Sequence, residues 1–349
     1  MKQLGAIAAA VAMVVAAVVI RAGIDDAANT DGDARLVCAT ELEEACTELD
    51  DAVGGLDVTV EPAGDTLKRL IALGDSEVDE PGLDGWLVPG PWPQIVDIVR
   101  GQAQHRPVFE ESPATVARSP LVIVVLKDRG RVLGQGTCAG TVAWPCLGDV
   151  GGDDWDDVGG DAAWGRVKVA HADPTTSASG LAVLAQAAGE FFGGTDYSLA
   201  DLGTDEFRAW LERLEDAGSP AGSPFGEMLS AYPTAVYDAA GGTEAEAGPL
   251  LEDAAPDRRG AFTLLYPDPV ATADVVLALT TTKDRDDDIA DLAGGGRARE
   301  ALADSGWRVE GHDLARGLRQ KLALPNGTGL PTDPGVFLAL QDAWRQVTG

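Results

Sequence analysis

The sequence is poor in basic and aromatic residues, and it is strongly acidic. It has 26 lysines and arginines against 57 acidic residues, which gives a formal net charge of −31, and aromatic residues make up 5% of its 349 positions. Nucleic acids and anionic membrane surfaces are bound through clustered Lys and Arg, so neither is expected as a partner. The low aromatic content disfavours an aromatic cage for a quaternary amine. The acidity is interpreted as a solubility feature of the outer surface.

Histidine and cysteine are also scarce, with three and four residues respectively. This leaves little material for a metal site, and no metal or cofactor is expected. The cysteines form two pairs with the same spacing of eight, Cys38 with Cys46 and Cys138 with Cys146. In an exported protein an even number favours disulfides, and these local pairings are the simplest of the three possible ones. A four-cysteine zinc site is the alternative, and so is a nucleophile elbow at 136–140 with Cys in place of Ser.

The N-terminus differs from the rest of the chain. An uncharged run of seventeen residues, Leu4–Ile20, lies between Lys2 and Arg21. This length falls between the core of a signal peptide and a minimal membrane span. Residues 1–21 are therefore predicted to be a signal peptide or an N-terminal membrane anchor, with a buried core helix as the alternative. Residues 22–34 are rich in Asp, Ala and Gly and are predicted to be a linker. The protein is expected to be exported, either secreted or tethered to the cell envelope.

Beyond the linker, short apolar segments alternate with amphipathic ones, which predicts an α/β protein with a parallel sheet. Strands are predicted at 36–39, 58–61, 83–88, 121–126, 167–170 and 261–266. Helices are predicted at 41–51 with Thr40 as N-cap, around Leu67–Ile71, from Pro93, after Gly180 and at 336–347. Helices are expected to dominate after residue 269.

Two segments stand out within this pattern. Residues 121–126 are uniformly apolar, so both faces of that strand should be buried. Residues 149–161 contain six aspartates among glycines. They are predicted to form a solvated loop, because the ligand spacing of known calcium loops is absent.

The segment Asp173–Gly180 carries the clearest chemical signal. Four hydroxyl side chains and a glycine stand at the start of an amphipathic helix that follows a strand. A helix N-terminus offers unpaired N–H groups and partial positive charge, which suits an anion or an oxygen-rich solute. Helix capping alone is the alternative, because Ser, Thr and Asp are favoured caps.

Several motifs in this order resemble those of an extracellular solute-binding protein of the type II periplasmic binding protein class. They are Leu36–Leu42, Asp84–Pro89, Ser119–Val124, Trp155–Val158, Asp173–Gly180 and Tyr266–Pro269. The resemblance covers most of residues 34–349.

The resemblance implies two α/β lobes, each a mostly parallel sheet flanked by helices, with the ligand between them. Lobe I would comprise residues 34–119 plus 265–349, and lobe II residues 120–264. Two crossing strands, at 121–126 and 261–266, would join the lobes. Closure around the ligand would be a hinge motion.

Eight ligand-contacting residues are carried over from the resemblance. Those expected to face the cleft are Thr40, Thr66, Trp86 and Ser119 from lobe I, Thr176, Ser177 and Ser179 from lobe II, and Tyr266 from the hinge. Because hydroxyls and helix N-termini line this predicted cleft, the acidity of the chain does not indicate a cationic ligand.

The function that follows is capture of a small polar solute or oxyanion without chemistry, for an ABC-type importer with its permease. The alternatives are a binding or sensing module without a transporter and, less favoured, an exported hydrolase. A hydrolase would depend on His105, His171 or His312, and the chain contains no Gly-x-Ser-x-Gly motif.

Overall fold

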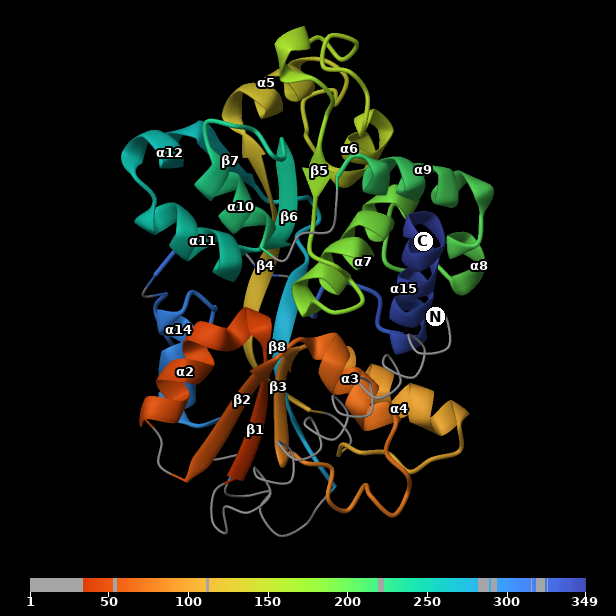
Figure 1. Cartoon of the computed structure of the whole chain (residues 1–349), viewed down its shortest axis with the longest axis vertical. Coiled ribbons are helices and arrows are strands. Elements are labelled where there is room, and N and C mark those ends of the chain that lie inside the picture. The colour runs from red at the N-terminus through yellow and green to blue at the C-terminus, as the bar shows by residue number, and fades with distance from the viewer. Residues whose placement is uncertain are drawn as a thin grey trace, which may run out of the picture.

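Eight strands form one continuous twisted sheet that runs the length of the molecule (Figure 1). The strands are β1 (Ala34–Ala39), β2 (Leu56–Glu61), β3 (Gly85–Pro89), β4 (Ala114–Leu126), β5 (Val169–Ala170), β6 (Ala239–Thr243), β7 (Phe262–Leu265) and β8 (Thr272–Leu279). Their order is β2-β1-β3-β8-β4-β6-β5, and β7 also pairs with β4.

The computed structural model describes residues 34–52, 55–110, 113–218, 223–281, 289, 294–314, 316–317, 324 and 326–349. The predicted signal peptide or anchor at 1–21 and the predicted linker up to residue 33 lie outside these ranges. Ala34, which we predicted to end the linker, is the first residue of β1.

The long strand β4 divides the sheet into two lobes. Its first half, Ala114–Pro120, pairs with β8, and its second half, Leu121–Leu126, pairs with β6 and β7. We call the part built on β1, β2, β3, β8 and the first half of β4 lobe I. The part built on the second half of β4 and on β5, β6 and β7 is lobe II. The predicted two-lobe α/β architecture is confirmed.

Strand directions follow from the way the chain is connected. The pairs β1–β2, β1–β3 and β5–β6 are parallel, as expected when helices connect successive strands. All the pairs that involve β8 or β4 are antiparallel. Antiparallel pairing therefore involves β4, which passes between the lobes, and β8, which follows the return of the chain to lobe I.

Helices cover both faces of each lobe. Those connected with lobe I are η1 (Thr40–Leu42), α2 (Glu43–Ala52), α3 (Ala63–Ile71), α4 (Trp92–Gln102) and α14 (Gly296–Asp304), and the last helix, α15 (Pro334–Thr348), contacts helices of both lobes. Those in lobe II are α5 (Lys127–Gln135), α6 (Trp144–Val150), η2 (Ala162–Trp164), α7 (Ala178–Phe192), α8 (Leu199–Leu202), α9 (Asp205–Asp216), α10 (Pro224–Ala231), α11 (Glu244–Asp253) and α12 (Pro256–Ala261). Among the described residues, none of the helices has both the length and the apolar character needed to cross a membrane.

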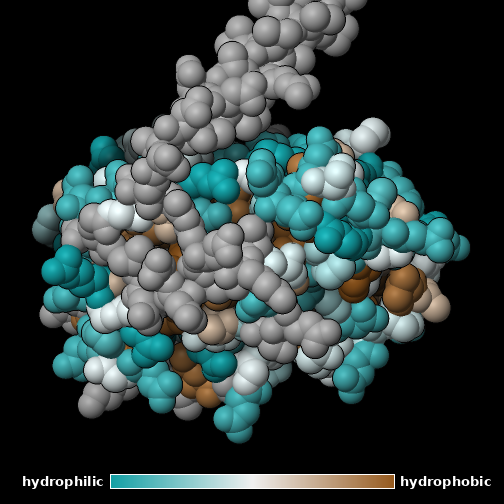
Figure 2. All heavy atoms as spheres, turned by 90° about the horizontal axis from the view of Figure 1, so that it is seen from below, coloured by the Kyte–Doolittle hydropathy of each residue, from teal (hydrophilic) through white to brown (hydrophobic). Residues whose placement is uncertain are grey.

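The apolar segment of β4 is buried on both faces, as its sequence predicts. Leu121, Ile123 and Val125 pack into one core cluster, and the alternate residues Val122 and Val124 pack into another. Alternate side chains of a strand point to opposite faces, so each face of this segment lies under helices. Outside the core, the face of the molecule seen in Figure 2 is mostly hydrophilic, in keeping with the charge of the chain.

Two details of the predicted element pattern are wrong. Thr40 does not cap a helix: it is the first residue of η1, whose N-cap is Ala39, and no side chain bonds there. A strand was also missed after residue 269: β8 lies at the centre of the sheet between β3 and β4, ahead of the expected helices α14 and α15. The chain crosses back to lobe I between β7 and β8, after the predicted strand at 261–266.

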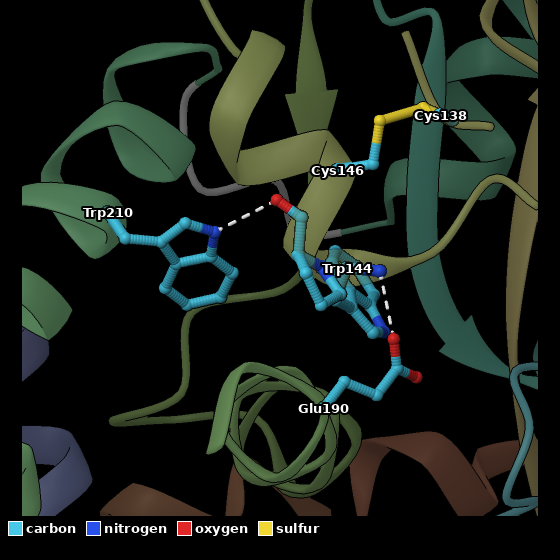
Figure 3. Close-up of a disulfide and its surroundings, with 6 residues drawn as sticks. Cys138, Trp144, Cys146, Glu190 and Trp210 are labelled. Atoms are coloured by element: carbon cyan, nitrogen blue, oxygen red, sulfur yellow. Dashed lines mark hydrogen bonds between the residues drawn. A yellow bond between two sulfur atoms is a disulfide. The ribbon is translucent and has the colours of Figure 1, made fainter. Parts of the chain in front are cut away.

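Both predicted local disulfides are present, Cys38–Cys46 with an S–S distance of 2.03 Å and Cys138–Cys146 with 2.01 Å. No cysteine is left as a zinc ligand or a nucleophile, which overturns both alternatives. The second bridge encloses a buried tryptophan, Trp144, which is the first residue of α6 (Figure 3). The Trp144 backbone N–H donates to Glu190 Oε2 at 2.9 Å, and Trp210 Nε1 donates to the Pro145 carbonyl at 3.1 Å.

Candidate functional site

A cavity of about 900 Å³ lies between the two lobes. From lobe I it is lined by η1 and the start of α2, and from lobe II by the loop before α7 and by parts of α10 and α11. Pockets that hold small organic molecules have volumes of about 300–1,000 Å³, so this interlobe cavity is large enough for one.

The loop before α7 is held in shape by its own side chains. Asp173 Oδ1 accepts hydrogen bonds from both N and Oγ1 of Thr175, each at 2.7 Å. Ser177 is the N-cap of α7, and its Oγ accepts from Gly180 N at 3.0 Å. A Cβ on Gly180 would lie 2.3 Å from the Ala172 carbonyl oxygen, so the tight turn requires glycine there.

A carboxylate from lobe I occupies the N-terminus of α7. Glu41 Oε1 accepts hydrogen bonds from Ser177 Oγ at 2.7 Å and from Ser179 N at 3.1 Å. Its other oxygen, Oε2, is buried without a hydrogen-bond partner. The helix dipole and the free N–H groups stabilise negative charge at this position. A side chain of the protein itself thus lies where the sequence predicted an anion to bind.

A second glutamate lies on the other side of Ser179. Ser179 Oγ donates to Glu246 Oε1 at 3.0 Å, while Glu246 Oε2 accepts from N and Oγ1 of Thr243, both at 2.9 Å. Glu246 and Thr243 form the capping box of α11. The pKa of Glu246 is raised to about 7, mainly by burial and to a smaller extent by the charge of Glu41.

The raised pKa of Glu246 predicts that part of the stability is lost as the pH rises. The carboxyl pKa is 4.5 without these influences and about 7 in the fold, so between these values the folded state holds a proton that the unfolded state has released. The contribution is fully present below pH 4.5 and is lost as the pH passes 7, and its size is about 3 kcal/mol at most. Urea unfolding measures the free energy of unfolding at pH 5 and at pH 8. The decrease between these two pH values should be smaller for Glu246→Gln than for the wild type.

A second carboxyl, which lies outside the cavity, tests the same reasoning. Burial also raises the pKa of Glu190 to about 7, despite the hydrogen bond from Trp144 N. Glu190→Gln should therefore flatten the pH dependence by a similar amount, and the double variant by the sum of the two. Equal slopes for the wild type and Glu246→Gln would contradict the prediction.

The lobes also touch through their backbones. Gly64 N, in the first turn of α3, donates to the Thr176 carbonyl at 3.1 Å. A Cβ on Gly64 would lie 2.1 Å from the Thr175 carbonyl oxygen and 2.8 Å from Thr176 Cα. The absence of a side chain at Gly64 thus permits the close approach of lobe I to lobe II seen here.

Three of the eight predicted ligand contacts, Thr40, Thr176 and Ser177, line the cavity. Ser179 is buried directly behind them and joins Glu41 to Glu246.

The other four predicted contacts are occupied elsewhere. Thr66 is buried and donates to Glu61 Oε1 at 2.7 Å. Trp86 lies in the core of lobe I, where its ring stacks on Phe109 at 5.8 Å. Ser119 is buried, and its Oγ accepts from Ala245 N at 2.9 Å.

Tyr266 belongs to a polar cluster near the return to lobe I. Its hydroxyl donates to Glu244 Oε2, and Glu244 forms an ion pair with Arg308 at 2.8 Å. Glu244 is buried, so this ion pair is shielded from water. Tyr266 is therefore part of the connection between lobes and does not line the cavity.

His171, which the hydrolase alternative needs, is buried in a structural contact. Its Nε2 lies 2.8 Å from Glu215 Oε1 and its Nδ1 lies 2.7 Å from the Ala172 carbonyl. Trp344 of α15 donates to the other oxygen of Glu215 at 2.8 Å. Burial opposes protonation of His171, but Glu215 outweighs it and the pKa of His171 is raised. Both ring nitrogens are thus engaged, and Glu215 joins His171 to Trp344 of α15.

Within the described residues, no group of three or more His, Cys, Asp or Glu side chains is arranged to hold a metal ion. The aspartate-rich segment 149–161 is partly ordered by its own contacts, because Asp161 accepts from Ala163 N at 2.9 Å at the start of η2.

Comparison with known sequences identifies the family. The sequence profile of the family described as bacterial extracellular solute-binding protein matches residues 38–308, which is more than half of the chain. The chain belongs to this family. Among curated protein sequences, none matches this solute-binding protein.

Solved structures show the same fold at low sequence identity. A periplasmic thiamin binding protein has a TM-score of 0.54 and 11% identity, with 90% of this chain and 96% of that chain covered. Iron-bound HitA from Pseudomonas aeruginosa has a TM-score of 0.59 and 12% identity, with 91% and 100% covered. The apo ferric ion-binding protein A from Pasteurella haemolytica has a TM-score of 0.53 and 12% identity, with 90% and 95% covered. The solute-binding protein described here therefore has the predicted type II periplasmic binding protein fold.

Proposed function

We propose that this protein captures a small polar solute between its lobes and delivers it to an ABC-type importer, without chemistry of its own. The observation that carries the proposal is the interlobe cavity, to which both lobes contribute polar groups. Membership of the solute-binding family supports the same function. The fold neighbours named above bind thiamin or iron, which shows that this architecture serves chemically different solutes.

The proposal includes the organisation of the chain. Residues 1–21 would direct export or anchor the protein in the membrane, and 22–33 would act as a linker. Residues 34–119 plus 265–349 would move as lobe I, and 120–264 as lobe II, around the crossing segments. Of the predicted contacts, Thr40, Thr176 and Ser177 would touch the solute directly, with Ser179 holding the carboxylates behind them.

The test is calorimetry and thermal unfolding of the full chain with a library of amino acids, sugars, oxyanions, amines and vitamins. A solute present at 100 times its Kd should stabilise the fold by about 2.7 kcal/mol. Thr40→Tyr, which puts a ring into the cavity, should abolish that stabilisation. Thr47→Tyr is the control, because Thr47 is exposed on α2 and does not line the cavity.

Failure of every solute in the library at millimolar concentration would overturn the proposal. Equal binding by the wild type and Thr40→Tyr would place the solute elsewhere. Copurification with a permease from detergent-solubilised membranes would distinguish import from transporter-independent sensing.

A further inference from the structure

The side chains that line the interlobe cavity are unequal in charge. Six acidic residues line it, against one basic residue among those that the structure describes. The basic residue is Arg316, and it already forms ion pairs with Glu44 and Asp253. Among the described residues, the cavity thus has a marked excess of negative charge and no further basic lining residue to balance it.

Three of the four remaining carboxylates are held in place by neutral donors. Glu41 is bonded by Ser177 and by a backbone N–H, and Asp173 Oδ1 by Thr175. Glu246 is bonded by Ser179 and Thr243. Such bonds orient a carboxylate without neutralising its charge, so the potential inside the cavity stays negative.

The predicted anion-binding position in the cavity is already occupied. Glu41 takes the N-terminus of α7, where an oxyanion would otherwise be stabilised, and its Oε2 is buried with no hydrogen-bond partner. An anionic solute would have to displace Glu41 and would then face the other carboxylates. A positively charged group would instead reduce the repulsion between Glu41 and Glu246.

The size of the cavity and its apolar side chains indicate a solute that is larger than a single ion. A cavity of about 900 Å³ is much larger than a single ion requires, and Phe225, Pro249 and Leu250 provide apolar surface. Such surface packs against carbon atoms, while the carboxylates on the opposite wall fix a charged end of the solute.

Resting on the function proposed above, we propose that the solute is a small organic cation, with its positive group beside Glu41 and Glu246 and its apolar part against the Phe225 side of the cavity.

The test compares solutes of different charge on the full chain by calorimetry. The cations are putrescine, arginine and thiamin, and the comparison set is sulfate, citrate and glucose. At least one cation should bind more tightly than every member of the comparison set. A tighter anion or neutral solute overturns this inference and leaves the proposed function standing.

Charge-neutral variants test the residues. Glu41→Gln keeps an oxygen that can accept from Ser177 and Ser179 but removes the charge, and Glu246→Gln does the same beside Thr243. Each should weaken binding of the preferred cation by about tenfold or more, and leave any binding of glucose unchanged. Glu212→Gln is the control, because Glu212 is exposed on α9 and does not line the cavity.

Thermal unfolding of each variant checks that the fold is intact, and the two variants give independent measurements. Unchanged cation affinity in both folded variants overturns the inference. If none of the six probes binds, the inference is also overturned, and the solute library described above decides whether the broader function fails with it.

Discussion

Gly64→Ala should keep the protein folded and prevent the lobes from closing fully. The new Cβ would lie 2.1 Å from the Thr175 carbonyl oxygen, and the nearby atoms are backbone atoms of lobe II that no side-chain rotation can move. Overpacking of this kind costs about 1–3 kcal/mol. Because the cost falls on the closed form alone, the solute found by calorimetry should bind about tenfold to hundredfold more weakly. X-ray scattering with the solute present should give a larger radius of gyration than for the wild type.

The matched control for this prediction is Gly101→Ala. Gly101 lies in α4, and a Cβ there would meet no atom within 4 Å. Alanine favours helix over glycine by about 1 kcal/mol, so this variant should be slightly more stable and should bind normally. If Gly64→Ala bound and compacted like the wild type, the contact between α3 and the loop before α7 would not limit closure.

Trp144→Ala should cost about 3–5 kcal/mol of unfolding free energy, the usual range for a buried tryptophan. The side chain is fully buried, and its Nε1 donates to Gln186 Oε1 at 3.1 Å. Its ring lies on β6, where a Cβ at Gly241 would come within 2.5 Å of it. Removing the ring leaves a cavity between α6, α7 and the sheet and takes the donor from Gln186. Urea unfolding followed by circular dichroism measures the loss.

Trp144→Phe separates the contributions of the ring and of its N–H group. Phenylalanine keeps most of the apolar contact and loses the hydrogen bond to Gln186, which is worth about 1 kcal/mol and more if the acceptor stays buried. This variant should therefore lie between the wild type and Trp144→Ala. A loss below about 1 kcal/mol for Trp144→Ala would mean that neighbouring side chains refill the space.

The same contact explains why one strand was missed in the sequence. Strand β6 has the sequence Ala-Ala-Gly-Gly-Thr, which has little intrinsic preference for a strand. The structure needs those glycines, because Trp144 lies over Gly241 and Phe225 lies over Gly242. Packing against distant residues decides the conformation here, and a local pattern cannot reveal it.

Strand β8 was missed for a different reason. It is clearly apolar, with Val275, Val276 and Leu277 in its middle, but it follows the break at Pro267–Pro269, after which we expected helices. In contrast, β1, β2 and the helices α3, α7 and α15 were predicted because their apolar residues recur with the right period.

The location of the candidate site could be predicted from the sequence, but the charge of the side chains around it could not. The hydroxyls of Asp173–Gly180 marked the N-terminus of α7, and Thr40, Thr176 and Ser177 do line the cavity. Glu41 and Glu246 were missed, although Glu41 is the second residue after β1 and Thr243–Glu246 has the spacing of a capping box. No local sequence pattern shows that these two side chains, which are more than 200 positions apart, both contact Ser179.

The disulfide Cys38–Cys46 encloses the stretch of chain that supplies the lobe I wall of the cavity. Thr40, Glu41, Glu43, Glu44 and Ala45 all lie between the two cysteines and all line the cavity. A covalent loop of this size restricts the conformations of its residues before any solute arrives. Less entropy is then lost on binding, so the wall is preorganised and a given set of contacts yields higher affinity. Reducing conditions should accordingly weaken solute capture, measured by calorimetry, before they unfold the protein.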